Sequence, residues 1–280
     1  MTDNSAQKAA ASYILPALDS DFLLRDSMRG TRFLLEYAKA EEFLRAWGVR
    51  STVVVFGSAR IMPGGSDDPN AASAPLPAGA RPRAGSQSAR WYDEARRLGR
   101  IVSERGGALT PVNGLRDNVI ATGGGPGIME AANRGAHDAG APSIGFNISL
   151  PREQEPNAYS TPDLTFLFHY FAMRKMHFAM RAAALVVFPG GFGTFDEFFE
   201  LLTLVQTGKM KRVPIVVFDR SYWMRLVNFP LLVEEGMISP KELDLFAYAD
   251  DAEEAWRLLV AGGLTVPPAR GVEPRSDVAP

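Results

Sequence analysis

Apolar positions along the chain follow two alternating patterns. Short, nearly continuous apolar runs alternate with longer segments in which apolar side chains recur every three or four positions. Runs of the first kind are typical of buried strands, and segments of the second kind are typical of amphipathic helices. Strands are therefore expected at 51–56, 118–122, 143–148, 164–168, 184–188, 213–218 and 245–248, and helices at 91–105, 127–139, 169–181, 195–207, 221–235 and 251–260.

The expected strands are nearly continuous apolar runs, without a regular alternation of apolar and polar residues. Strands of this kind are buried on both faces, and helices long enough to cross between parallel strands lie between most of them. The predicted fold class is therefore α/β, with a doubly wound parallel sheet covered by helices on both sides.

Three further segments frame this sheet. Residues 1–50 are expected to form an N-terminal helical extension, because apolar residues recur at helical spacing over 15–47. Residues 62–90 are crowded with Pro, Gly, Ala and Ser and are expected to be a flexible surface insertion, which need have no role of its own. The Pro-rich segment 263–280 is expected to be a disordered tail, which leaves 51–262 as the core domain.

Composition and charge narrow the choice of partners. A formal net charge of -2 provides no overall positive field, so long nucleic acid is not expected as a partner. The chain has no cysteine, which excludes disulfides, zinc–thiolate sites and thiol nucleophiles, and its three histidines lack metal-binding spacing. With neither a secretory signal nor an apolar run long enough to cross a membrane, a cytoplasmic location and no membrane partner are expected.

Two glycine-rich turns follow expected strands and lead into expected helices. The first is TGGGPG at 122–127 and the second is PGGFGT at 189–194. Ligands bind beyond the carboxyl ends of parallel strands, where glycines let the backbone approach an anion and helix starts offer free N–H groups. One such turn alone can simply be a tight turn, but two in one sheet favour a phosphate site. We therefore predict that the turns hold the phosphate of a small nucleoside monophosphate.

Other phosphate-binding and hydrolytic motifs are absent. The sequence contains no G-x-x-x-x-G-K-[ST] and no G-x-S-x-G, and the GGGPG turn is not a clean G-x-G-x-x-G. P-loop ATPases, serine hydrolases and dinucleotide-dependent dehydrogenases are therefore disfavoured.

Thr194 and Glu197 open the helix after the second turn. Thr194 is placed to cap that helix and to donate its hydroxyl to a phosphate oxygen. Glu197 is either the glutamate of a Thr-x-x-Glu capping box or a functional carboxylate, and the two roles are compatible. A carboxylate at a helix start is favoured in its ionised form, so it suits stabilising the oxocarbenium character that develops when a glycosidic bond is cleaved.

Arg174 and Lys175 precede the strand that carries the second turn. They form either a solvated basic pair or, in the functional interpretation, a pair from which Arg174 reaches the substrate or Glu197. Ser58 and Arg60 follow the first strand and are placed to line the same crevice, although Ser58 is also an ordinary turn residue.

Three motifs together resemble the LOG ("Lonely guy") family of cytokinin riboside 5′-monophosphate phosphoribohydrolases. They are GGGPGIME at 123–130, MRK at 173–175 and PGGFGTFDE at 189–197, and the similarity extends over roughly 51–218. The resemblance implies a Rossmann-like fold and an N-glycosyl hydrolase that converts a nucleoside 5′-monophosphate to free base and ribose 5-phosphate. It also implies a homodimer or higher homo-oligomer, with sites near the subunit interface, and neither a metal nor an organic cofactor.

The resemblance assigns roles to individual residues. Arg174 and Glu197 would be the catalytic pair. Substrate and phosphate would be bound by Ser58, Gly124, Gly125, Gly127, Glu130, Lys175, Gly190, Gly191, Gly193 and Thr194. Members of this family have often been labelled lysine decarboxylases, but the sequence shows no framework for pyridoxal phosphate on a lysine. The alternative to hydrolysis is a nucleotide-binding or carrier module of the same fold that binds without turnover.

Overall fold

The computed structural model describes residues 3–64, 87–150 and 155–267. Most of the insertion expected at 62–90 and most of the tail expected at 263–280 lie outside the described residues, at 65–86 and 268–280. Over the described residues no helix combines the length and apolarity that crossing a membrane requires.

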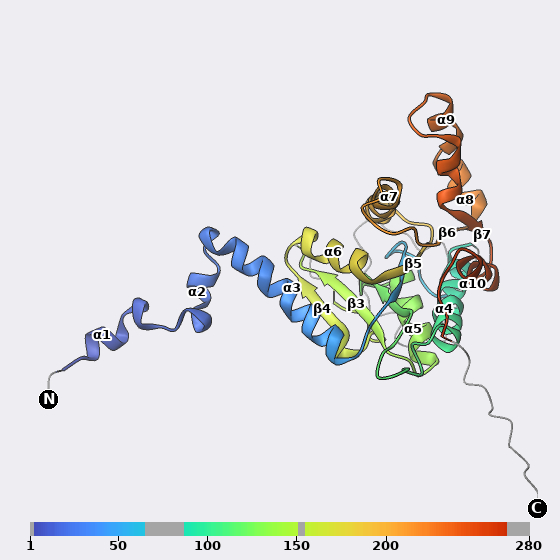
Figure 1. The fold of residues 1–280 in the computed structure, drawn as a ribbon. Coiled ribbons are helices and arrows are strands. Elements are labelled where there is room, and N and C mark those ends of the chain that lie inside the picture. Colours follow the sequence, from blue (N-terminus) through green and yellow to red (C-terminus); the bar gives the residue numbers. More distant parts are fainter. Residues whose placement is uncertain (1–2, 65–86, 151–154, 268–280) are drawn as a thin grey trace, which may run out of the picture.

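A seven-stranded parallel sheet, counted over the described residues, forms the centre of the molecule, in the order β4-β3-β2-β1-β5-β6-β7 (Figure 1). The α/β fold class with a parallel, Rossmann-like sheet is thereby confirmed. The strands are β1 Thr52–Phe56, β2 Val119–Thr122, β3 Ser143–Ile148, β4 Thr165–Phe168, β5 Ala182–Val187, β6 Ile215–Phe218 and β7 Ala247–Ala249.

The strand order reverses its direction at the middle of the sheet. The chain builds outward from β1 through β2 and β3 to β4, then returns to the other side of β1 with β5 and continues to β7. The loops that follow β1 and β5 therefore diverge from each other at the carboxyl edge. A crevice at such a switch point is where ligands bind in open α/β sheets.

Helices cover both faces of the sheet, and successive residues of β1 show this directly. Val53 and Val55 belong to the core cluster on one face, whereas Val54 and Phe56 belong to the cluster on the other. The first face is covered by α4 Gln87–Arg105, α5 Ile128–Asp138 and α10 Ala252–Ala261, and the second by α3 Arg29–Ala46, α6 Phe171–Arg181, α7 Phe192–Gln206, α8 Arg220–Leu226 and α9 Phe229–Glu234.

The single helix expected over 221–235 is in fact two helices. Helix α8 ends at Leu226, and α9 begins at Phe229 with the Asn228 side chain accepting a hydrogen bond from the amide of Leu231. Pro230 explains the break, because proline is tolerated in the first turn of a helix but not in its interior.

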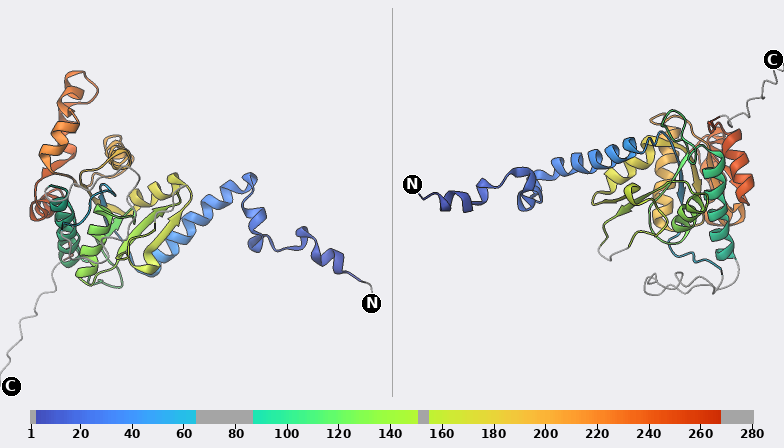
Figure 2. Two further views of the ribbon diagram at one scale, coloured as in Figure 1. Left: turned by 180° about the vertical axis from the view of Figure 1, so that it is seen from behind. Right: turned by 90° about the horizontal axis from the view of Figure 1, so that it is seen from below.

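The N-terminal segment divides into an arm and one long helix. Residues 3–28 contain α1 Ser5–Ala9, α2 Ser20–Leu23 and short 3-10 turns at Ala11–Tyr13, Pro16–Leu18 and Asp26–Met28, and no residue of these elements is buried. They extend away from the sheet in every view (Figures 1 and 2). Helix α3 is different, because its Ala40 and Leu44 belong to the core beneath the sheet. Further 3-10 turns lie at Pro162–Leu164 and Pro240–Leu245.

Candidate active site

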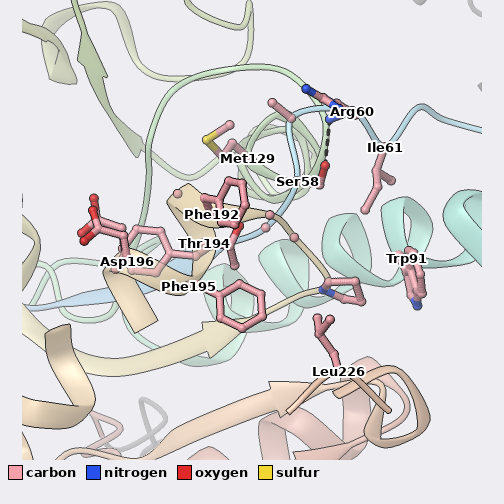
Figure 3. Close-up of a pocket in the computed structure, with 18 of the residues that line it drawn as sticks. Ser58, Arg60, Ile61, Trp91, Met129, Phe192, Thr194, Phe195, Asp196 and Leu226 are labelled. Carbon is pink, nitrogen blue, oxygen red and sulfur yellow. Dashed lines mark hydrogen bonds between the residues drawn. The ribbon is translucent and has the colours of Figure 1, made fainter. Parts of the chain in front are cut away.

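A cavity of about 890 Å³ opens at the switch point of the sheet, beyond the carboxyl ends of β1 and β5 (Figure 3). It is lined by the loop after β1, the PGGFGT turn after β5, and side chains from α4, α5, α6, α7 and α8. The structure brings together here both catalytic candidates, Arg174 and Glu197, and Arg60. It also brings in five of the residues predicted to bind substrate or phosphate: Ser58, Gly190, Gly191, Gly193 and Thr194.

Ser58 connects the loop after β1 to both glycine-rich turns. Its amide donates to the carbonyl oxygen of Pro189 over 3.0 Å, and its carbonyl oxygen accepts from the amide of Ile128 over 3.1 Å. Gly127 must be a glycine here, because its φ is +75° and a Cβ would overlap the carbonyl of Ser58. Main-chain bonds thus hold the three loops at one edge of the sheet.

Helix α7 begins earlier than the sequence indicated. Its first residue is Phe192 and its N-cap is Gly191, with the first helical bond running from the amide of Phe195 to the carbonyl of Gly191. The prediction that Thr194 caps this helix is wrong, and so is the capping box with Glu197, because no side chain caps α7. The glycines allow the chain to enter the helix directly, and Thr194 is buried within its first turn.

The start of α7 offers free donors to the cavity. Because helical hydrogen bonds begin at Phe195, the amides of Phe192, Gly193 and Thr194 have no acceptor within the helix. All three residues line the cavity. Such a set of amides, at the positive end of a helix dipole, is suited to binding an anion such as a phosphate group.

Arg174 and Glu197 form a buried ion pair in the wall of the cavity. The Nη1 atom of Arg174, on α6, lies 3.2 Å from Oε1 of Glu197, in the second turn of α7. The Nε atom of Arg174 donates to the carbonyl oxygen of Phe146 over 2.6 Å, and its guanidinium lies 5.0 Å from the centre of the Phe178 ring. These contacts fix the guanidinium in one orientation against the carboxylate.

Burial dominates the protonation behaviour of this pair. It raises the pKa of Glu197 from its usual 4.5 to about 7, more than the charges of Arg174 and Lys175 lower it. Burial likewise lowers the pKa of Arg174, against the opposing effect of Glu197. The expectation that Glu197 is strongly favoured in its ionised form is therefore wrong, because its side chain lies in a buried wall and not at the solvated helix start. A carboxyl group that titrates near neutrality is suited to exchanging a proton during a reaction.

The first glycine-rich turn lies against the guanidinium of Arg174. A Cβ on Gly123 would lie 2.6 Å from Nη2 of Arg174, so the missing side chain leaves room for the guanidinium. The amide of Gly124 donates to the hydroxyl of Thr122, and Asn157 donates to the carbonyl oxygens of both Gly124 and Gly125. Gly124, Gly125 and Gly127 do not line the cavity. This turn follows β2, one strand away from the switch point.

Two other predicted binding residues also lie outside the cavity wall. The Nζ atom of Lys175 lies 2.8 Å from Oδ1 of Asp196 and 3.1 Å from Oε2 of Glu200, which directs it along the outer side of α7. Glu130 accepts a hydrogen bond of 2.7 Å from the hydroxyl of Tyr92, a residue buried under α5. Both therefore have partners within the protein.

Sequence reasoning missed the apolar walls of the cavity. Met129 and Phe192 lie within the quoted motifs but were given no role there. Other apolar wall residues lie on α4, α6 and α8, outside the motifs: Trp91, Phe171, Tyr222 and Leu226. Figure 3 shows Trp91 and Leu226 beyond the glycine turn, at a distance from Asp196 and Met129.

Asp219, the residue directly after β6, fixes part of this wall. It accepts from the indole of Trp91 over 2.8 Å and from the amide of Tyr222 over 2.9 Å. The hydroxyl of Tyr222 in turn donates to the carbonyl oxygen of Gly190 over 3.0 Å. Its position directly after a strand was the feature of the sequence from which a place near the site could have been predicted for Asp219. Among the described residues no group of three or more His, Asp or Glu side chains could hold a metal ion.

Comparison with known proteins gives sequence matches that cover about half of the chain. Residues 129–259 match the family described as "Possible lysine decarboxylase". Cytokinin riboside 5′-monophosphate phosphoribohydrolase LOG3 of Arabidopsis thaliana is 30% identical over 140 residues, which cover 49% of this chain and 64% of that protein. The probable cytokinin riboside 5′-monophosphate phosphoribohydrolase LOG4 of Oryza sativa subsp. japonica is 31% identical over 140 residues, covering 49% and 60%. The chain thus spans less than two thirds of the length of these relatives.

Among solved structures, the molybdenum cofactor binding protein from Rippkaea orientalis aligns with a TM-score of 0.45 at 17% identity. The alignment covers 76% of this chain and 97% of that chain. A likeness at this level does not bear on what the present chain binds.

Proposed function

We propose that the chain hydrolyses the N-glycosidic bond of a nucleoside 5′-monophosphate, which its three motifs and its similarity to LOG-family proteins support. The products would be the free base and ribose 5-phosphate. The observation that carries the proposal is the Arg174–Glu197 pair, which lies in the wall of the same cavity as the free amides of α7.

The phosphate is proposed to bind at the start of α7. The amides of Phe192, Gly193 and Thr194 would donate to its oxygens, and the dipole of the helix would favour its negative charge. Glu197 lies on the same helix three residues beyond Thr194, so a ribose joined to this phosphate comes within reach of the buried carboxyl.

Glu197 is proposed to act as the base in the reaction. In its carboxylate form it would take a proton from a water molecule that attacks C1′ while the C1′–N bond breaks. The base departs with the bonding electron pair and takes up a proton from solvent, and Glu197 returns to solvent the proton that it took from water. While the bond breaks, the carboxylate also stabilises the positive charge that develops on the ribose. Arg174 keeps the carboxylate in place and favours its ionised form.

The decarboxylase description of the matched family does not fit this cavity. Pyridoxal phosphate chemistry requires a lysine that forms a Schiff base. No lysine contributes to the lining supplied by the described residues, and Lys175 is occupied by Asp196 and Glu200.

The test is an assay of base release by the purified full chain, with AMP and with an N6-substituted AMP as substrates. We expect free base and ribose 5-phosphate in equal amounts, with Glu197→Gln inactive. Release of base by neither substrate would contradict the proposal. If a nucleotide binds saturably with no base released over hours, the chain is a binding or carrier module.

A further inference from the structure

The residues that lead into α6, the helix that carries the site residues Phe171 and Arg174, are held by a distant part of the chain. The N-cap residue of this helix, Tyr170, provides no side-chain cap. Instead, Glu36 in α3 binds the amides of the two residues that precede the helix. Its Oε1 accepts from the amide of His169 over 2.8 Å, and its Oε2 accepts from the amide of Tyr170 over 3.3 Å.

Two neighbours of Glu36 reinforce the same junction. The Nε atom of Arg32 donates to the hydroxyl of Tyr170 over 2.8 Å, and the ring of Phe33 meets the ring of Tyr170 edge-on at 4.4 Å. Tyr170 is thus held from α3 by three side chains. Side chains of α3 therefore hold the residue that precedes α6.

Helix α3 also holds α6 at its middle and at its end. The ring of Tyr37 stacks on the ring of His177 at 5.7 Å. Further along, Glu41 accepts two hydrogen bonds from the guanidinium of Arg181, at 2.7 and 2.8 Å. Neither contact involves Glu36, so we expect variants of Glu36 to fold and to be testable.

Arg174 lies one helical turn beyond Tyr170. Its amide donates to the carbonyl oxygen of Tyr170 over 3.2 Å, which is the first helical bond of α6. Phe171, the first residue of the helix, and Arg174 both line the cavity. Glu36 does not line it. Any loosening of the first turn would therefore move the guanidinium relative to Glu197 without touching a bound ligand.

We propose that Glu36 is a positioning residue, which holds the first turn of α6 and thereby keeps the guanidinium of Arg174 against the carboxyl of Glu197. The inference rests on the proposed function, in which this pair carries the reaction. It makes helix α3 part of the catalytic unit, although α3 precedes the sheet and contributes no atom to the cavity.

A purely structural role would lower stability alone, whereas a positioning role changes the chemistry of Glu197. The nearby guanidinium lowers the pKa of Glu197 against the effect of burial. Displacing Arg174 weakens that effect, so the acidic limb of the activity profile should move to higher pH.

The experiment compares Glu36→Ala and Glu36→Gln with Glu42→Ala, an exposed glutamate on the same helix. For Glu36→Ala we expect kcat to fall by about tenfold with KM nearly unchanged, because small displacements of a catalytic group are costly. The acidic limb should shift upward, and hydrogen exchange of the amides at 170–175 should become faster. Glu36→Gln keeps an acceptor oxygen and should recover part of kcat, and Glu42→Ala should match the unmodified protein.

Unchanged kcat and an unchanged acidic limb in Glu36→Ala would overturn the proposal, whatever happens to its melting temperature. If the unmodified protein releases no base, the proposed function fails instead. Hydrogen exchange still decides the positioning question in that case, because unaltered exchange at 170–175 in Glu36→Ala would show that Glu36 does not hold the first turn.

Discussion

The guanidinium of Arg174 lies 3.2 Å from the carboxylate of Glu197, and the two side chains are only 11% and 6% exposed. A buried pair of this kind is sensitive to the loss of one member, because the remaining charge is left without a partner. We expect Arg174→Ala to lower the free energy of unfolding by about 3 kcal/mol and to abolish base release. Chemical denaturation and the base-release assay check the two parts. A variant that keeps full stability would contradict the burial of the pair.

Replacement of Glu197 by glutamine separates chemistry from packing. The amide keeps the shape of the side chain and one acceptor for Arg174, but it cannot take a proton. We expect kcat to fall by at least about 100-fold, with nucleotide binding changed little. Isothermal titration with a nucleoside monophosphate measures the binding. Comparable losses in affinity and kcat would show that Glu197 serves binding and not the reaction.

The pH dependence of activity follows from the raised pKa of Glu197. If the carboxylate is the reactive form, kcat/KM should rise with pH and reach half its plateau near pH 7. A profile measured on the unmodified protein tests this. A limb near the usual pKa of a glutamate, 4.5, would mean that another group controls the rate.

Stability should depend on pH in the opposite direction. Between 4.5 and about 7 the folded protein holds the Glu197 proton more tightly than the unfolded chain does, so this group stabilises the fold below 4.5 and its contribution is lost as the pH rises through about 7. Unfolding free energies measured at about pH 5 and about pH 8 should therefore fall more in the unmodified protein than in Glu197→Gln. Equal falls would contradict the assignment.

Gly123→Ala tests the space behind Arg174. The added Cβ would lie 2.6 Å from Nη2 of Arg174 and 2.8 Å from the sulfur of Met129, so both side chains must shift. We expect kcat to fall by about tenfold with a small loss of stability. Gly30→Ala, in α3, is the matched control, because no atom lies within 4 Å of its added Cβ. Equal activity of the two variants would contradict this role of Gly123.

Gly190→Ala tests the phosphate-binding turn. Its Cβ would overlap the hydroxyl of Thr194, so the start of α7 must move. We expect KM for a nucleoside monophosphate to rise while the weak binding of the corresponding nucleoside stays the same. Adding Thr194→Gly removes the side-chain atoms that the new Cβ would overlap, including the Cβ of Thr194 itself, so the double variant should be no worse than Gly190→Ala alone. Strictly additive losses would show that the two residues act independently.

The strands could be predicted closely from the sequence, because each is a short, mostly apolar run. The expected bounds of β1 to β7 agree with the structure within two residues at either end. Helix starts were less predictable, since Thr194 has the sequence of a cap but the glycines before it begin α7 at Phe192. The interior break at Pro230 could have been predicted from its ring chemistry.

The site itself was predictable only in part. Residues on turns after β1 and β5 could be placed, because strand ends and glycines fix where backbone meets ligand. Side chains on helices could not, since their direction depends on packing: Lys175 pairs with Asp196 and Glu200 and does not line the cavity, although its neighbour Arg174 does. Glu36 could not be recognised either. It binds the amide of His169, which lies 133 residues further along the chain, and no local sequence pattern connects the two residues.

Both hydrogen bonds through which Ser58 joins the neighbouring loops are made by main-chain atoms, so every amino acid except proline can form them. Position 58 nevertheless faces the cavity. For protein engineering this is a favourable combination, because a library at this codon would vary the shape and polarity presented to the ligand while both bonds to the neighbouring loops remain. Within its own loop, most members would lose the hydrogen bond from the amide of Arg60 to the Ser58 hydroxyl. Altered preference among nucleotides could thus be selected at a single site.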